Sequence, residues 1–327
     1  MNVGELELRP ATLDDAAFVA DLETAAHPDD TVDPQLLRHW WTIVAPDSTV
    51  ERFVVSLGGR PVGWAVRSHV AWSKMPERFA RVGGELHPSV RTAGRLGALF
   101  EVMEARSIED GARALTVWTW EHDATRLEAV AARGYREERR ERFWELDLVA
   151  ERERLARMAE ESRERMRREG IQVLTLAQEP DPDRYRKIRR MSNEAEADVP
   201  TTVPHVPLPF EQFMEWFRSP GLREDRIWIA RESDDVVGIS MLSYPPVRGV
   251  VATDWTGTAR KVRGRGVARA LKCETVMQAI ALGVDRVRTD NDGQNTPILH
   301  INATMGYRRR PDMIQHLKRV EAVRRAQ

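Results

Sequence analysis

The sequence contains a long internal repeat, and this feature constrains its fold more than any other. Residues 87–112, HPSVRTAGRLGALFEVMEARSIEDGA, resemble residues 259–284, ARKVRGRGVARALKCETVMQAIALGV. The following pairs lie 172 positions apart: Arg91 and Arg263, Gly94 and Gly266, Leu99 and Leu271, Gly111 and Gly283, Tyr135 and Tyr307. A spacing that holds over more than forty residues without an insertion indicates a duplicated domain.

Each copy shows the same order of predicted elements. Residues 51–70 and 225–244 each contain two β-branched or aromatic runs separated by a polar or glycine-rich turn, which predicts a β-hairpin. A helix-like stretch precedes each hairpin, and a strand, a glycine loop, a helix, a strand, a second helix and a closing strand follow it. This order predicts an α/β fold in which each copy has a mixed sheet flanked by helices.

We expect three parts along the chain: an N-terminal domain over 1–149, a connecting helix over 150–170 and a C-terminal domain over 171–327. The stretch VAERERLARMAEESRERMRREG is charged and rich in helix formers, and Gly170 ends it as a C-terminal cap. Its apolar residues are too sparse for a coiled coil. We therefore predict a solvated helix here.

Composition limits the classes of partner. Lys plus Arg number 50 against 51 Asp plus Glu, so no overall positive field attracts nucleic acid or an anionic membrane. No apolar run approaches the ~20 residues of a membrane span, and the start MNVGELELRPATLDDAA lacks the pattern of a signal peptide. We expect a cytoplasmic monomer or homodimer. Cys273 is the one cysteine, which excludes an internal disulfide, and no residue spacing suggests a metal site.

The stretch KVRGRGVARALK, residues 261–272, predicts an anion site. Gly264 and Gly266 remove two side chains where a strand turns into a helix, which leaves backbone N–H groups open at the helix N-terminus. Arg263 and Arg265 add charged donors. A Walker A loop needs Gly-Lys followed by Ser or Thr, which is absent, and a dinucleotide-binding loop should follow the first strand. The expected ligand is a phosphate or pyrophosphate.

These residues resemble the Gcn5-related N-acetyltransferases (GNAT). Arg263, Gly266 and Ala268 match the family signature Arg/Gln-x-x-Gly-x-Gly/Ala, and ATDWTGT (252–258) stands where the family's acetyl-CoA strand does. The resemblance implies that acetyl-CoA is bound, with its pyrophosphate on the loop amides and its pantetheine arm on the strand. It implies that the following residues contact the cofactor: Thr256, Gly257, Thr258, Arg263, Gly264, Arg265, Gly266, Val267, Ala268 and Asn295.

The N-terminal copy departs from this pattern. It has Thr92 in place of a loop glycine, Leu96 in place of the last small residue, and Asp123 at the position of Asn295. We expect Leu96 to obstruct the approach of phosphate and Asp123 to repel it, so that changing Leu96 to Gly alone alters little. The arrangement resembles tandem proteins such as the mycothiol synthases, in which the C-terminal copy is active. We expect the same division here.

The acid and the base are less well marked. In many family members, a tyrosine four residues before a Gly-Phe pair acts as the general acid. This chain has Asn302 at that position, and an asparagine cannot donate a titratable proton. Asp254 lies two residues before Thr256, so strand alternation places both on one face, and it is the candidate base. Glu194, Glu196 and His205 belong to the part of the fold that lines acceptor pockets. Residues 197–221 are either a packed surface loop or a lid.

The sequence thus predicts an acetyl-CoA-dependent N-acetyltransferase that acts on an amine of a small molecule by direct attack. Two alternatives stay open. The chain could be a tandem module that binds acyl-CoA without turnover, which Asn302 and the altered first loop would suit. It could also be an acyltransferase that modifies a hydroxyl or uses a longer acyl donor.

Overall fold

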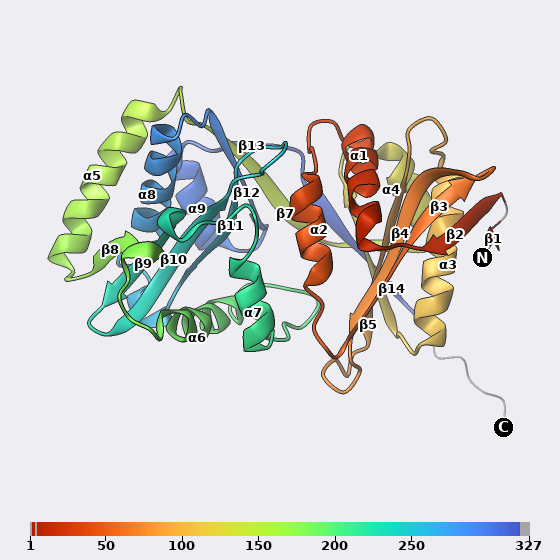
Figure 1. The fold of residues 1–327 in the computed structure, drawn as a ribbon, viewed down its shortest axis with the longest axis horizontal. Coiled ribbons are helices and arrows are strands. Elements are labelled where there is room, and N and C mark those ends of the chain that lie inside the picture. Colours follow the sequence, from red (N-terminus) through yellow and green to blue (C-terminus); the bar gives the residue numbers. More distant parts are fainter. Residues whose placement is uncertain (1, 4, 321–327) are drawn as a thin grey trace.

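A computed structural model describes residues 2–3 and 5–320 of the chain. Two similar lobes lie side by side, and a long sheet runs through both (Figure 1). The first lobe contains β1 (Asn2–Val3), β2 (Leu6–Pro10), α1 (Ala16–Ala26), α2 (Pro34–Thr42), β3 (Ser48–Leu57), β4 (Arg60–Val70), β5 (Phe79–Leu86), α3 (Ala93–Glu109), β6 (Ala114–Trp120), α4 (Ala124–Ala132) and β7 (Arg136–Asp147). The helix α5 (Arg152–Arg168) leads to the second lobe.

The second lobe repeats this order, as the sequence predicted. It contains β8 (Gln172–Thr175), α6 (Arg184–Glu196), α7 (Phe210–Phe217), β9 (Ile227–Glu232), β10 (Asp235–Ser243), β11 (Ala252–Thr258), α8 (Val267–Ala281), β12 (Arg286–Asp292), α9 (Thr296–Met305), β13 (Arg308–Arg309) and β14 (Met313–Arg319). The equivalent strands β6 and β12 begin and end 172 positions apart. No helix in the described part of the chain is both long and apolar enough to cross a membrane.

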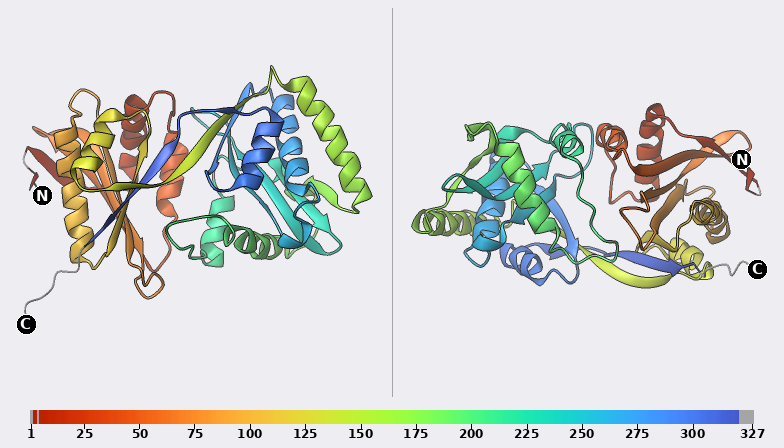
Figure 2. Two further views of the ribbon diagram at one scale, coloured as in Figure 1. Left: turned by 180° about the vertical axis from the view of Figure 1, so that it is seen from behind. Right: turned by 90° about the horizontal axis from the view of Figure 1, so that it is seen from below.

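The two lobes exchange their closing strands, which the sequence did not predict. The sheet order is β1-β2-β3-β4-β5-β6-β14-β7-β12-β11-β10-β9-β8, and β13 pairs with β7. The end of the N-terminal copy, β7, therefore pairs with β12, and the end of the C-terminal copy, β14, lies between β6 and β7. Figure 2 shows these two strands side by side where they cross between the lobes.

The exchange joins the cores of the two lobes. Trp144 and Leu146 of β7 are buried in a cluster with Cys273, Val276 and Val287 of the second lobe. Burial of one large apolar side chain contributes about 1.5–3 kcal/mol. The exchange also pairs strand edges that would otherwise be exposed. Each lobe is thus completed by the other.

The prediction of a solvated α5 is wrong. Its residues Leu155, Ala159, Ser162 and Met166 are buried, and this face packs along α8. They are four, three and four positions apart, which places them on one side of a helix. Two of these four residues, Ala159 and Ser162, are small, so the spacing of large apolar residues alone does not reveal this face. Gly170 lies at φ +68° just beyond the helix, as expected of a C-terminal cap.

The proline-rich segment 197–209 crosses to the first lobe. Its Val203 and Val206 pack against the buried side chains of Met75 and Phe79. The segment leads into α7, whose aromatic rings form a cluster with the ring of Tyr185 on α6. It is therefore a surface loop that packs against the first lobe, which is one of the two predicted alternatives.

Candidate active site

A cleft opens in the second lobe between β11 and β12. These parallel strands pair only at Ala252 and Arg288 and then diverge. A cavity of about 1010 Å³ lies between them beyond this pair. The loop before α8 and the first turns of α8 and α9 complete its walls. Arg139 and Glu141 of β7 also line it, so the strand exchange brings two side chains of the N-terminal copy to the site.

The glycine loop lies at the mouth of this cleft. Gly264 and Gly266 have φ of +76° and +90°, a conformation that other residues rarely adopt, and both line the cavity. Gly266 is the N-terminal cap of α8, and no side chain caps this helix end among the described residues. The helix therefore presents free N–H donors and the positive end of its dipole to the cleft, which suits an anion. Val267 and Ala268 also line the cavity, as predicted.

The two loop arginines differ from each other. Arg263 lines the cleft, and its Nη1 donates to Asp198 Oδ2 at 2.7 Å. Arg265 does not line it, because Glu169 and Glu232 hold its guanidinium at 2.8 Å each. Its prediction as a cofactor contact does not agree with this geometry. Side-chain direction, which spacing does not reveal, decides the difference.

Two other arginines, Arg165 and Arg269, line the cleft near the glycine loop and were not predicted from the sequence. Arg165 of α5 lines the cleft and donates from Nη2 to the carbonyl oxygen of Gly264 at 2.9 Å, while Arg269 projects from the first turn of α8. The buried face of α5 holds Arg165 in this place. No local sequence signal connects residue 165 with residue 264.

The strand β11 has a bulge at Asp254. Met241 of β10 pairs with Trp255 and the next residue, Leu242, pairs with Thr253, so Asp254 has no partner on β10. Such bulges turn side chains and are common beside active sites. Asp254 and Thr256 both line the cleft, although the bulge interrupts the strand alternation from which this was predicted. Gly257 and Thr258 line it too.

Three acidic side chains, Glu141, Asp254 and Asp290, line the cleft. The pKa of Asp254 is raised to about 6, because burial and the charge of Asp290 together outweigh the opposing hydrogen bond from Trp216 Nε1 at 2.7 Å. Burial and the charge of Asp290 raise the pKa of Glu141 to about 7. Desolvation by the surrounding protein also raises the pKa of Asp290. Of these three carboxylates, the sequence analysis found only Asp254.

The two asparagines occupy different environments. Asn295 is the N-terminal cap residue of α9 and lines the cleft, where it can reach a ligand. Asn302 is fully buried and is not part of the cleft wall; its Nδ2 donates to Asn291 Oδ1 at 2.6 Å. The position at which the family usually has its acid thus contributes no proton donor to the cleft.

The other acceptor-side candidates do not line the cleft. His205 Nε2 forms an ion pair with Glu196 at 2.9 Å, and Glu194 accepts a hydrogen bond from the backbone N–H of Arg260. Glu194 therefore helps to hold the start of the glycine loop. Glu196 and His205 hold the end of α6 to the segment that crosses between the lobes.

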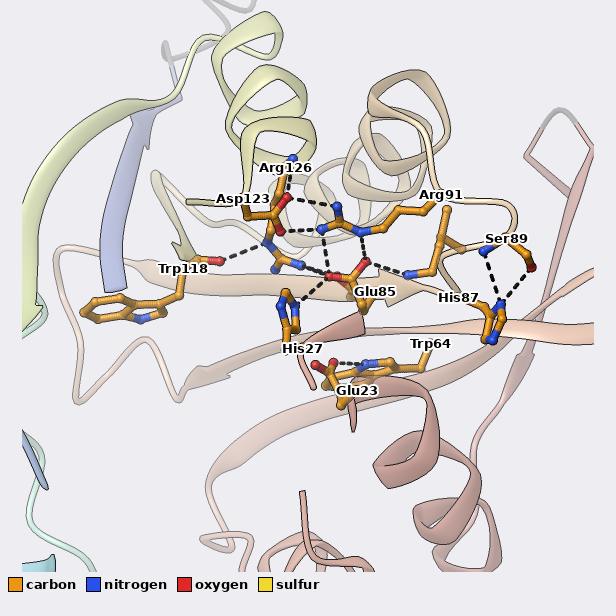
Figure 3. Close-up of polar contacts among 12 residues, drawn as sticks. Glu23, His27, Trp64, Glu85, His87, Ser89, Arg91, Trp118, Asp123 and Arg126 are labelled. Carbon is orange, nitrogen blue, oxygen red and sulfur yellow. Dashed lines mark hydrogen bonds and ion pairs between the residues drawn. The ribbon is translucent and has the colours of Figure 1, made fainter. Parts of the chain in front are cut away.

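In the first lobe, the position equivalent to Gly257 holds a carboxylate. Glu85 lies 172 positions before Gly257 and is fully buried. Arg91, the counterpart of Arg263, donates to Glu85 at 2.7 Å and to Asp123 at 2.9 Å, and Arg126 and His27 also contact Glu85 (Figure 3). Burial alone would raise the pKa of Glu85, but these partners outweigh it and hold the pKa well below its usual value.

The predicted obstruction of the first loop by Leu96 does not agree with the structure. Leu96 is fully buried among Leu99 and Phe100 and points into the core, so it does not stand in the path of a phosphate. The carboxylates of Glu85 and Asp123 already neutralise Arg91. With His27 they form a group of three potential metal ligands, but the guanidinium groups of Arg91 and Arg126 already occupy the carboxylates.

The fold and the cleft define a class: two mixed α/β lobes with a glycine loop and a splayed pair of parallel strands in the second. No family model and no curated protein sequence matches the chain. Solved structures do. A tandem GNAT protein from the clavulanic acid biosynthesis pathway matches with a TM-score of 0.74 and 18% identity over 96% of this chain and 98% of that one.

Two further solved structures have the same arrangement. A GCN5-related N-acetyltransferase from Sphaerobacter thermophilus matches with a TM-score of 0.66 and 19% identity, covering 97% of this chain and 96% of that one. A putative acetyltransferase from Pyrococcus horikoshii matches with a TM-score of 0.56 and 12% identity, covering 98% and 92%. The chain therefore has the tandem GNAT fold, and the resemblance inferred from its sequence is confirmed for the fold.

Proposed function

We propose that this protein is an acetyl-CoA-dependent N-acetyltransferase whose working site is the cleft of the second lobe. One observation carries the proposal: the cleft between β11 and β12 begins at an uncapped helix end with two glycines in the left-handed conformation. Such a helix end suits a pyrophosphate, and a splayed strand suits an extended arm. The likeness to tandem GNAT structures supports the same assignment.

The described residues suggest how each part of acetyl-CoA would be held. The pyrophosphate would lie on the N–H groups from Gly264 to Ala268, with Arg263, Arg165 and Arg269 around it. The edge of β11 that faces β12 pairs only at Ala252 in the described structure, which leaves its later backbone groups for the pantetheine arm and the thioester carbonyl. Bound acetyl-CoA supplies an activated acyl group.

Asp254 is the proposed base. Its raised pKa of about 6 keeps it ionised at neutral pH while making it a better proton acceptor than an exposed aspartate. The bulge turns it out of the strand, and Trp216 holds one of its oxygens. Asp254 would take the proton from the amine as nitrogen attacks the carbonyl carbon. The acceptor would be a small-molecule amine that enters beside Asp290 and Glu141.

The first lobe would complete the site rather than form a second one. It supplies β7, whose Arg139 and Glu141 line the cleft, while Glu85 and Asp123 occupy the arginine of its own loop. This gives a physical reason for retaining the N-terminal copy. It also explains why the inactive loop still contains Arg91, because that residue compensates a buried carboxylate.

A module that binds acyl-CoA without turnover is the second candidate, and the burial of Asn302 away from the cleft favours it. To separate the two, calorimetry would measure CoA binding, and a thiol reagent would measure CoA release from acetyl-CoA across a panel of amines and alcohols. We expect binding and amine-dependent release, both retained in an Arg91→Gln control, and loss of release but not of binding in Asp254→Asn. Binding without turnover on any amine would refute the transferase assignment, and release with alcohols only would redirect it to O-acylation.

A further inference from the structure

A buried lysine lies at the cleft. Lys272 of α8 is 2% exposed and lines the cavity. Over residues 2–3 and 5–320, no hydrogen bond or ion pair to its Nζ is found, and Nζ lies over the ring of Tyr307, 5.1 Å from the ring centroid. Lysines are almost never buried to this extent unless they are paired. A methionine of similar length would suit the place better, so the charge needs an explanation.

The groups around Lys272 make its proton mobile. Burial lowers its pKa to about 8, while Cys273 on the same helix and Asp290 across the cleft act weakly in the opposite direction. Tyr307, the residue before β13, faces it, and burial raises the pKa of Tyr307 well above its usual value, so it stays neutral. Near neutral pH, Lys272 therefore carries a proton that it can give up readily.

The proposed reaction needs such a donor. A thiolate leaves when the thioester breaks, and Asn302 neither titrates nor lines the cleft. Asp254 is assigned to the amine side, and arginines do not give up protons. Lys272 and Glu141 are the other cleft residues whose pKa values lie near neutral pH, and Glu141 is assigned to the amine side with Asp290. His300 also lines the cleft, but its side chain is exposed.

We propose that Lys272 donates the proton that converts the departing CoA thiolate into the thiol. This inference rests on the proposed function and adds the acid to it. The amine nitrogen bonds to the acetyl carbon, the C–S bond breaks with its electron pair going to sulfur, and sulfur takes a proton from Lys272 Nζ. Asp254 holds the proton lost by the amine. Lys272 then regains a proton from water and Asp254 loses one, so the sum is amide plus free CoA thiol.

The first experiment needs no acceptor. Bromoacetyl-CoA, an alkylating analogue of acetyl-CoA, is incubated with the intact protein, and the modified peptide is identified by mass spectrometry. We expect alkylation at Lys272, blocked by excess CoA and faster as the pH rises through about 8, where the amine becomes neutral. A His300→Gln control should label to the same extent. CoA-protected alkylation elsewhere, with Lys272 unmodified, would overturn the inference.

The second experiment uses Lys272→Met, which keeps the length of the side chain and removes its proton. We expect CoA affinity within about threefold of the parent protein, a fall in kcat of about 10²-fold, and loss of the alkaline decline in kcat that marks an acid. An unchanged kcat with an unchanged pH profile would overturn the inference while leaving the transferase assignment intact. Failure of the parent protein to bind CoA would overturn both.

Discussion

Replacing Trp216 with Phe should move the pH dependence of the reaction in a defined direction. Trp216 Nε1 donates to Asp254 Oδ2 at 2.7 Å and so stabilises the ionised carboxylate. A hydrogen bond to a charged group contributes about 1.5–3 kcal/mol, and 1.36 kcal/mol corresponds to one pH unit. Its loss should therefore raise the pKa of Asp254, and the acidic limb of kcat/KM should move upward by about one to two pH units from its position near 6.

The sign follows from the role of a base. Asp254 must be ionised to accept a proton, so the rate falls as the pH drops through its pKa, and a higher pKa moves that fall to higher pH. The assay is CoA release at saturating acetyl-CoA from pH 5 to 9, together with a carbon-13 NMR titration of the aspartate carboxyl groups. Trp228→Phe is the matched control, because the indole of Trp228 donates to Gln278 at 2.8 Å, away from the base. An acidic limb that stays in place in Trp216→Phe would refute the assignment of Asp254.

Three further predictions concern the loops and the exchanged strands. Gly266→Ala should weaken CoA binding at least tenfold, since φ is +90° and the new Cβ would lie 3.1 Å from the Arg165 guanidinium; calorimetry should show no change for its counterpart Gly94→Ala, whose Cβ meets open space. Arg91→Met should lower the free energy of unfolding by about 3 kcal/mol in urea, because it removes a partner of the buried Glu85, and leave CoA affinity unchanged; lost affinity would contradict a single working site. A fragment of residues 1–149 should not fold alone, because it lacks β14, and co-expression with 150–327 should restore a soluble complex; a folded, monomeric fragment would count against the exchange.

The glycine loop could be found in the sequence because its requirement is local. Only glycine readily takes the positive φ found at residues 264 and 266. Two closely spaced glycines in the sequence therefore predict this backbone conformation. The constant spacing of 172 positions revealed the duplication, because it can be found by aligning the two halves of the sequence. The same alignment, together with the family resemblance, located β11 and Asn295, which both line the cleft.

Side-chain direction at the site was predicted less well. Arg265 belongs to the glycine loop in sequence, but its side chain pairs with Glu169 and Glu232. Leu96 belongs to the corresponding stretch of the first copy, but its side chain packs into the core. Glu85 was overlooked because nothing in its neighbourhood marks it. Its importance depends on Arg91 and Arg126, which reach it from other elements.

The sequence alone thus determined the duplicated α/β architecture and the position of the glycine loop, because helix periods, strand alternation and glycine conformation are properties of short stretches. Only the tertiary structure decided which lobe each closing strand joins and which residues meet in the cleft. In a duplicated chain, β7 meets equivalent strand edges on β6 and β12, so its own residues do not specify the partner. Its pairing with β12 brings Glu141 to the site, and the packing of α8 against the cleft brings Lys272.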